Sequence, residues 1–197
     1  MAKSEQTPET SEYKGIFAFE GDWIPGDLSE GWSIRPNLET LRDMFKIEFV
    51  HRQIGTPGEL RHYVDKWLTK GKENYLSYPV GYFAFHGESG LIATGNGDVK
   101  LFQLERWING RAKGRVIAFH SCSTLNLEGE RIRTFLDRTK ASAVVGYAKD
   151  IDSLEAIALD LLVLWALTGH EPQLAEEILQ DDYPGLVERL GLTFHHA

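Results

Sequence analysis

The two residues of this chain best suited to chemistry, His86 and Cys122, each follow a short apolar run. One run spans residues 79–85 and the other spans residues 115–120. Runs of this kind are typical of strands buried in a parallel sheet. Because catalytic groups of open α/β sheets collect at the carboxyl ends of strands, neighbouring strands would bring this imidazole and this thiol together.

The pair predicts nucleophilic catalysis by cysteine. The thiolate is the reactive form of cysteine, so Cys122 needs a base nearby, and His86 is the candidate. Gly87 has no side chain, so its backbone N–H can closely approach a substrate oxygen. Together with the Cys122 N–H it is predicted to form an oxyanion hole, in which one donor is worth about 3 kcal/mol in other enzymes.

Other interpretations of these residues remain open. A lone cysteine at a strand end is often only a small buried apolar residue, and a histidine there is often structural. His120 lies two residues before Cys122, on the same side of the strand, which makes it a competing base. A histidine within a strand is, however, poorly placed to reach past the sheet edge. No histidine has metal-ligand spacing to the cysteine, so we expect neither a metal nor another cofactor.

Composition narrows the function classes. The 197-residue chain is 42% hydrophobic and 25% charged, as expected for one globular domain, and its net charge of −8 argues against nucleic-acid binding. A single cysteine rules out an internal disulfide and favours a cytoplasmic location. The apolar stretch 154–167 is shorter than the roughly 20 residues of a membrane span, so we expect a buried helix and no membrane partner.

Strand-like and helix-like patterns alternate along the chain. Predicted strands cover residues 14–19, 47–50, 79–85, 115–120 and 143–147, and Asn96-Gly97 predicts a hairpin turn after the third strand. We therefore expect an α/β fold, a three-layer α/β/α sandwich with a mainly parallel sheet and a small β-hairpin.

The domain organisation follows from the same pattern. Residues 1–13 are polar and are expected to form a disordered lead, followed by one domain over residues 14–197. Its core is expected over residues 14–168, with a helical extension over 171–197. No sixth strand is expected after the long helix.

Two motifs together resemble the caspase-like cysteine peptidases of clan CD. Phe83-Ala-Phe-His86-Gly87 is similar to the family's histidine motif, and Ile117-Ala-Phe-His-Ser-Cys122 to its cysteine motif. The greatest similarity is to the CHAT-domain and small bacterial caspase-like proteins, over roughly residues 14–167. The resemblance implies a His86–Cys122 dyad at the ends of the third and fourth strands, acting on a protein or peptide substrate.

Family resemblance also suggests bacterial stress, cell-death or antiviral signalling, with a partner protein as a regulator. It places the pocket for the residue before the cleaved bond between the loops after the first and fifth strands. Asp22 and Asp150 there favour a cationic side chain, whereas Arg35 favours an acidic one, and surface roles for all three are a third interpretation. Of these we expect cleavage after Arg or Lys.

Two further function classes compete with a peptidase. The first is a catalytically inactive caspase-like module that binds a protein partner through the 23–32 loop or the outer face of the 154–167 helix. The second is a nucleotide-binding protein that uses Gly95-Asn-Gly97 as a phosphate loop. The second is weak, because no glycine-rich loop opens a helix there and the chain has no Walker-type lysine motif.

Overall fold

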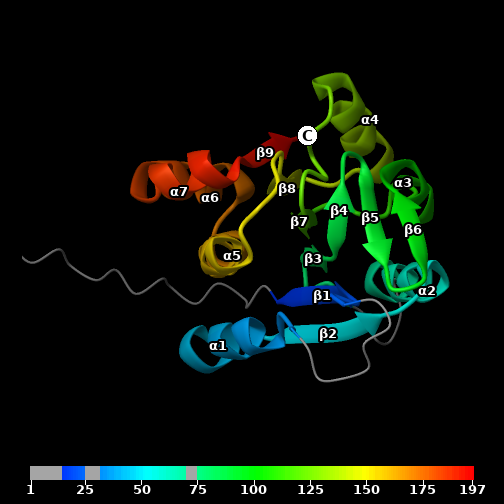
Figure 1. Ribbon diagram of the computed structural model, residues 1–197, viewed down its shortest axis with the longest axis horizontal. Helices are drawn as coiled ribbons and strands as arrows, with labels where there is room; N and C mark the ends of the chain where they lie inside the picture. Colours follow the sequence, from blue (N-terminus) through cyan, green and yellow to red (C-terminus); the bar gives the residue numbers. More distant parts are fainter. Residues whose placement is uncertain (1–14, 25–31, 70–74) are drawn as a thin grey trace, which may run out of the picture.

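Strands and helices alternate along the chain, as the apolar pattern predicts. The computed structural model describes residues 15–24, 32–69 and 75–197, and it shows a sheet with helices on both faces (Figure 1). The predicted α/β fold, a three-layer sandwich with a mainly parallel sheet, is confirmed.

The main sheet has six strands in the order β2-β1-β3-β7-β8-β9. These strands are β1 (Ile16–Gly21), β2 (Phe49–Ile54), β3 (Val80–Ala84), β7 (Val116–His120), β8 (Ala143–Tyr147) and β9 (Leu192–His196). The first five are parallel, and β9 runs antiparallel to β8. The central strands β1, β3, β7 and β8 are buried along their whole length, which explains their continuous apolar sequences.

Two hydrophobic cores lie on opposite faces of this sheet. Side chains alternate between the faces, so Tyr82 of β3 belongs to one core and Phe83 to the other. The first core is covered by α1 (Arg35–Phe45), α5 (Ser153–Gly169), α6 (Pro172–Asp182) and α7 (Pro184–Leu190). The second is covered by α2 (Pro57–Leu68), α3 (Leu101–Ile108) and α4 (Gly129–Thr139).

Local signals define the ends of the helices. Thr56 and Glu59 form a capping box at the start of α2, each side chain bonding to the backbone of the other. Asp152 caps α5 by accepting hydrogen bonds from the N–H groups of Leu154 and Glu155. α2 ends at Leu68, followed by Thr69 in an extended conformation. None of the helices that the structure describes is long and apolar enough to cross a membrane.

A second, smaller sheet follows β3 directly. It contains β4 (His86–Glu88), β5 (Leu91–Thr94) and β6 (Gly97–Lys100), all antiparallel. The hairpin turn consists of Gly95 and Asn96, one residue earlier than the predicted Asn96-Gly97, and Gly97 begins β6 with φ 121°. The predicted hairpin therefore has a third strand, and His86 begins that strand instead of lying in a loop.

The C-terminal segment differs from the sequence prediction. The expected helical extension begins with α6 and α7, but the chain then returns to the sheet as β9, so the prediction of no sixth strand is wrong. Its sequence hid this strand, because none of its residues except Leu192 is fully buried and it therefore lacks the continuous apolar run of the central strands.

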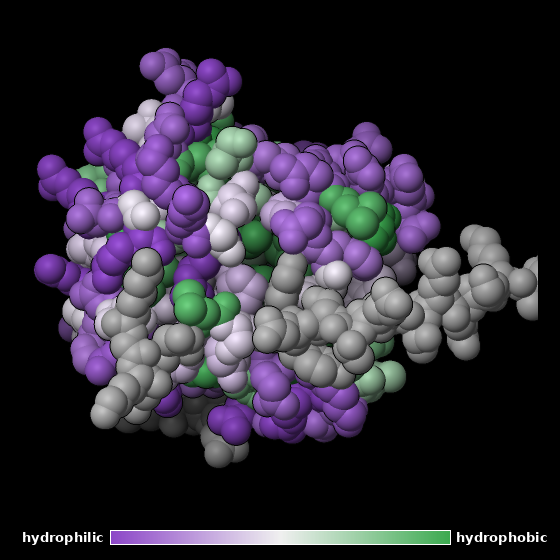
Figure 2. Space-filling view, turned by 180° about the vertical axis from the view of Figure 1, so that it is seen from behind, coloured by the Kyte–Doolittle hydropathy of each residue, from purple (hydrophilic) through white to green (hydrophobic). Residues whose placement is uncertain are grey.

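The second strand also lies later than predicted, at Phe49–Ile54 instead of 47–50. It is an edge strand that pairs only with β1, and its exposed residues Arg52 and Gln53 mask the apolar pattern. Seen from behind the view of Figure 1, the surface is mainly hydrophilic, with small and separate hydrophobic patches (Figure 2).

Candidate active site

The two runs that precede His86 and Cys122 form neighbouring strands, as predicted. β3 and β7 pair in parallel, with Ala84 opposite His120. His86 and Cys122 each lie two residues beyond this pair. The chain therefore leaves both strands at the same level, at the carboxyl edge of the sheet, where ligands of α/β proteins bind.

His86 is held by the loop that follows β1. Its Nε2 atom lies 2.7 Å from the backbone oxygen of Trp23, and the two rings meet edge to face with centroids 5.4 Å apart. Because a carbonyl oxygen only accepts, Nε2–H must be the donor. In neutral His86 the lone pair is then on Nδ1, which makes Nδ1 the basic atom.

Gly87 packs directly against the turn that carries Cys122. A Cβ atom at Gly87 would lie 2.7 Å from the Cβ of Ser121 and 2.8 Å from the Cys122 oxygen, closer than real Cβ atoms approach. Only glycine fits there without moving the backbone. This close contact joins the segment after β3 to the segment after β7.

The turn around Cys122 is tied to its neighbours on both sides. The Ser123 N–H donates to the Lys149 oxygen, and the Ser123 hydroxyl donates to Asp150 over 2.8 Å. Ser123 has a left-handed backbone with φ 52°, which is unfavourable for a residue with a side chain. The Thr124 hydroxyl bonds to the Leu91 oxygen. The position of Cys122 is therefore set by β5 and by the loop after β8.

Cys122 itself is half-buried. Within the described part of the chain, no acceptor is paired with its N–H, and no hydrogen bond joins it to His86. The N–H is thus available to a substrate oxygen. Hydrogen bonds of a catalytic pair often form only when the substrate binds.

A pocket of about 210 Å³ lies beside His86, on the face of the sheet covered by α1 and α5. Its wall is formed by Trp23, Ile24, Trp32, Ser33, Ile34, His86, His120, Ser153 and Ile157. Cys122 is not part of the wall. The pocket is therefore a mainly apolar chamber next to the candidate base, bounded by residues 23–24 and 32–34 and by the first turns of α5.

His120 forms part of this wall and belongs to a buried polar network. Its Nδ1 atom contacts the carboxylate of Asp160, which comes from the middle of α5. The hydroxyls of Tyr82 and Tyr147 donate to the same carboxylate at 2.5 and 2.6 Å. Burial and the nearby Asp160 charge raise the pKa of both tyrosines well above the usual value, so both remain donors.

This network was not predicted from the sequence. The available signal is a carboxylate at position 160, on the side of an apolar helix that faces the sheet, together with tyrosines in two buried strands. His120, expected to be poorly placed, instead borders the pocket. Because Nδ1 faces Asp160, Nε2 is the ring nitrogen left for the pocket.

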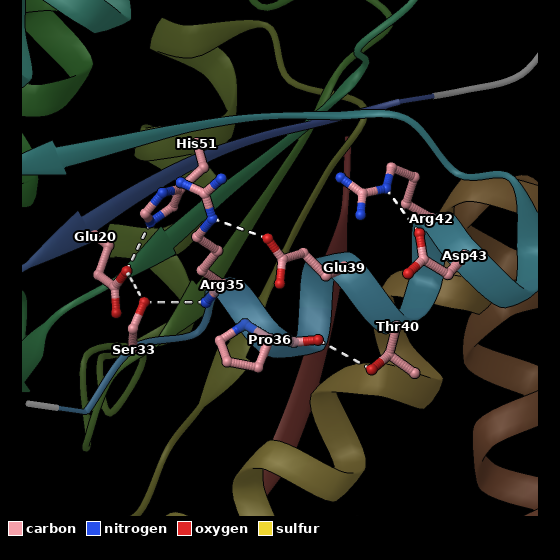
Figure 3. Close-up of polar contacts among 9 residues, drawn as sticks. All are labelled: Glu20, Ser33, Arg35, Pro36, Glu39, Thr40, Arg42, Asp43 and His51. Atoms are coloured by element: carbon pink, nitrogen blue, oxygen red, sulfur yellow. Dashed lines mark hydrogen bonds and ion pairs between the residues drawn. The ribbon is translucent and has the colours of Figure 1, made fainter.

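A second buried carboxylate, Glu20 of β1, organises the other side of the pocket. It accepts hydrogen bonds from the Trp23 indole at 2.6 Å, the Ser33 hydroxyl at 2.8 Å and the Ile34 N–H at 2.8 Å. Nε2 of His51 in β2 lies 2.6 Å from Oε2 of Glu20, the oxygen that also accepts from Ser33 (Figure 3). Burial of Glu20 raises its pKa, but these hydrogen bonds outweigh burial, and the net pKa is lowered.

The predicted specificity residues do not meet in the pocket. The Asp22 carboxylate packs against Gly95, and Asp150 is bonded to Ser123. Arg35 pairs with Glu39 at 3.0 Å on the β2 side of α1, where its side chain is 59% exposed (Figure 3). None of the three lines the pocket beside His86. Asp27, a further carboxylate of this loop, lies outside the described residues.

Across the described ranges, no group of three His, Cys, Asp or Glu side chains is arranged to hold a metal ion. Gly95-Asn96 forms the turn between β5 and β6 rather than the start of a helix, so the phosphate-loop alternative has no structural basis.

Comparison with sequence families matches residues 14–194 to DUF6642, a family of unknown function. The chain belongs to DUF6642. No curated protein matches it. The DUF6642 match extends from just before β1 into β9, so it includes every residue of the candidate site. Family membership assigns no activity to the chain.

Proposed function

We propose that this DUF6642 protein is a caspase-like cysteine endopeptidase that hydrolyses peptide bonds with a His86–Cys122 dyad. The observation that carries the proposal is the register of β3 and β7, from which His86 and Cys122 emerge at one level on neighbouring parallel strands. The close packing of Gly87 on the Cys122 turn supports it, because it holds both segments together.

In the first half of the reaction, the Cys122 thiol gives its proton to Nδ1 of His86, and the sulfur attacks the scissile carbonyl carbon. The backbone N–H groups of Gly87 and Cys122 stabilise the negative charge on the carbonyl oxygen. The C–N bond then breaks, and the His86 imidazolium protonates the leaving amine. The product is a thioester on Cys122.

Water completes the reaction. Nδ1 of His86 takes a proton from a water molecule, which attacks the thioester carbon, and the C–S bond breaks. Cys122 regains a proton and the acid product leaves. Throughout both halves, the hydrogen bond from Nε2–H to the Trp23 oxygen keeps His86 in one orientation.

The decisive experiment is cleavage of a peptide library by the wild-type chain and by Cys122→Ala. We expect cleavage only by the wild type. His86→Ala is expected to abolish turnover, whereas His120→Ala is expected mainly to reduce stability, because it disrupts the Asp160 network. Full activity of His86→Ala combined with loss in His120→Ala would transfer the role of base to His120.

An alternative function, an inactive caspase-like module that binds a protein partner, is favoured by exposed hydrophobic side chains near the pocket. Ile24 is 48%, Trp32 64% and Leu154 75% exposed. Thiol reactivity separates the two functions, and the single cysteine makes the measurement unambiguous. A catalytic Cys122 reacts with iodoacetamide much faster than glutathione does at neutral pH, and an inert Cys122 supports the binding module.

The substrate class proposed is a protein or peptide, and the compartment proposed is the cytoplasm, where a free catalytic thiol stays reduced. Regulation by a partner protein, and a role in bacterial stress, cell-death or antiviral signalling, rest on the resemblance to the caspase-like family.

A further inference from the structure

We propose that the pocket beside His86 binds an apolar side chain of the substrate, at the residue that precedes the cleaved bond. This inference rests on the proposed peptidase function and specifies its substrate. It replaces the expectation of cleavage after Arg or Lys.

The side chains that form the wall of the pocket are mainly apolar. Five of the side chains around the pocket are large and apolar, namely Trp23, Ile24, Trp32, Ile34 and Ile157. The polar ones are two hydroxyls and two imidazoles, and no Asp, Glu, Lys or Arg lines the pocket. Small-molecule and side-chain sites of this composition gain most of their affinity from apolar burial.

Three of the four polar side chains of the wall already have partners. Ser33 donates to Glu20, His86 donates to the Trp23 oxygen, and His120 contacts Asp160. A charged substrate side chain entering this chamber would lose its hydration without gaining an opposite charge, which is costly. An Arg, Lys or Asp side chain is therefore disfavoured relative to Leu, Ile or Phe.

The pocket lies beside the reacting bond and has room for one side chain. His86 belongs both to the wall and to the proposed dyad, so a side chain in the pocket lies next to the reacting bond. The volume of about 210 Å³ corresponds to roughly seven water molecules at about 30 Å³ each, the size of one large side chain. Ile24 and Trp32 are largely exposed in the free protein, and an apolar side chain against them removes this surface from water.

The test measures how fast peptidyl acyloxymethyl ketones alkylate Cys122, with Leu, Phe, Arg or Asp next to the reactive carbon. This readout does not require turnover, and mass spectrometry counts the label on the single cysteine. We expect the Leu and Phe reagents to react at least about tenfold faster than the Arg and Asp reagents, since the charged ones must be desolvated without a partner.

Two matched variants on α5 test whether the preference for the Leu and Phe reagents arises in the pocket. Ile157→Asp puts a carboxylate into the wall and is expected to slow the Leu and Phe reagents about tenfold and to speed the Arg reagent. Leu154→Asp adds the same charge one turn earlier on the same helix, outside the pocket, and is expected to keep the wild-type preference. Thermal melting of both variants checks that they are folded.

Different results would overturn the apolar pocket and the peptidase function. Rapid labelling by the Arg or Asp reagent, or equal effects of the two variants, would overturn the apolar pocket and leave the dyad in place. If every peptidyl reagent labels Cys122 no faster than it labels glutathione, the peptidase function itself fails.

Discussion

Asp160 shows how much a single residue can depend on tertiary partners. It is a carboxylate in the middle of the most apolar helix of the chain, and it is 96% buried. A buried carboxylate without partners costs several kcal/mol of stability. Two tyrosine hydroxyls and the His120 ring surround it, and they come from three different strands, so the network joins α5 to the centre of the sheet.

We therefore expect Tyr82→Phe and Tyr147→Phe each to lower the free energy of unfolding by about 1.5–3 kcal/mol, the usual worth of a hydrogen bond to a charged group. Urea denaturation measures the change. Tyr183→Phe is the matched control, because Tyr183 is 38% exposed, and it should shift stability by less than about 0.5 kcal/mol. Equal effects of all three substitutions would mean that Asp160 is not stabilised by these hydroxyls.

At the scale of elements, Glu20 links the end of β1 to the beginning of α1. Trp23 lies on one side of residues 25–31, and Ser33 and Ile34 lie on the other, and all three bond to this one carboxylate. The same residues form much of the pocket wall. The shape of the proposed substrate pocket therefore depends on a charge that is buried beneath it.

Stability from Glu20 must then depend on pH. The pKa of folded Glu20 is lowered from its ordinary value of 4.5, so the folded state prefers the ionised form. The resulting stabilisation is complete above about pH 4.5 and is lost as the pH falls through the lowered pKa. We expect Glu20→Gln to lower the free energy of unfolding by about 1.5–3 kcal/mol at pH 7, and by less below pH 4.

Urea denaturation at pH 7 and below pH 4 provides the measurement for Glu20→Gln. Glu39→Gln is the control, since Glu39 forms an exposed ion pair with Arg35 that is worth at most about 1 kcal/mol. If the loss in free energy of unfolding caused by Glu20→Gln stays constant over this pH range, the charge of Glu20 does not stabilise the fold.

For the whole molecule, the sequence predicts the central strands of the sheet better than its edge strands. Each central strand is buried on both faces, so its apolar run alone identifies it, and parallel strands require the helices between them. The edge strands β2 and β9 carry polar residues toward water, which moved the predicted bounds of β2 and concealed β9.

The same distinction applies to the candidate site. The neighbouring strands that carry His86 and Cys122 were predictable because strand ends in a parallel sheet meet at one edge. The partners of Asp160 and Glu20 were not, because each carboxylate bonds to residues far away in the sequence, such as Tyr82 and His51. Periodicity places a residue on a face but does not say which distant side chain meets it there.

β9 makes the C-terminal segment part of the sheet, and this leads to a prediction for the whole chain. Truncation after Gly191 removes Leu192, which is buried, and Phe194, which packs on the first core. It also leaves β8 as an edge strand, unpaired on the side that β9 occupies. Since burial of one large apolar side chain is worth about 1.5–3 kcal/mol, we expect a loss of at least about 3 kcal/mol and faster aggregation through the open edge.

Chemical denaturation and light scattering measure both effects of this truncation. His196→Ala is the matched control, because it removes the contact of His196 with Glu176 but keeps the strand, and it should cost less than about 1.5 kcal/mol. The truncation should also weaken any Cys122 activity, because the loop after β8 positions the Cys122 turn through Lys149 and Asp150. A truncated chain as stable and as active as the full one would make residues 192–197 an accessory segment.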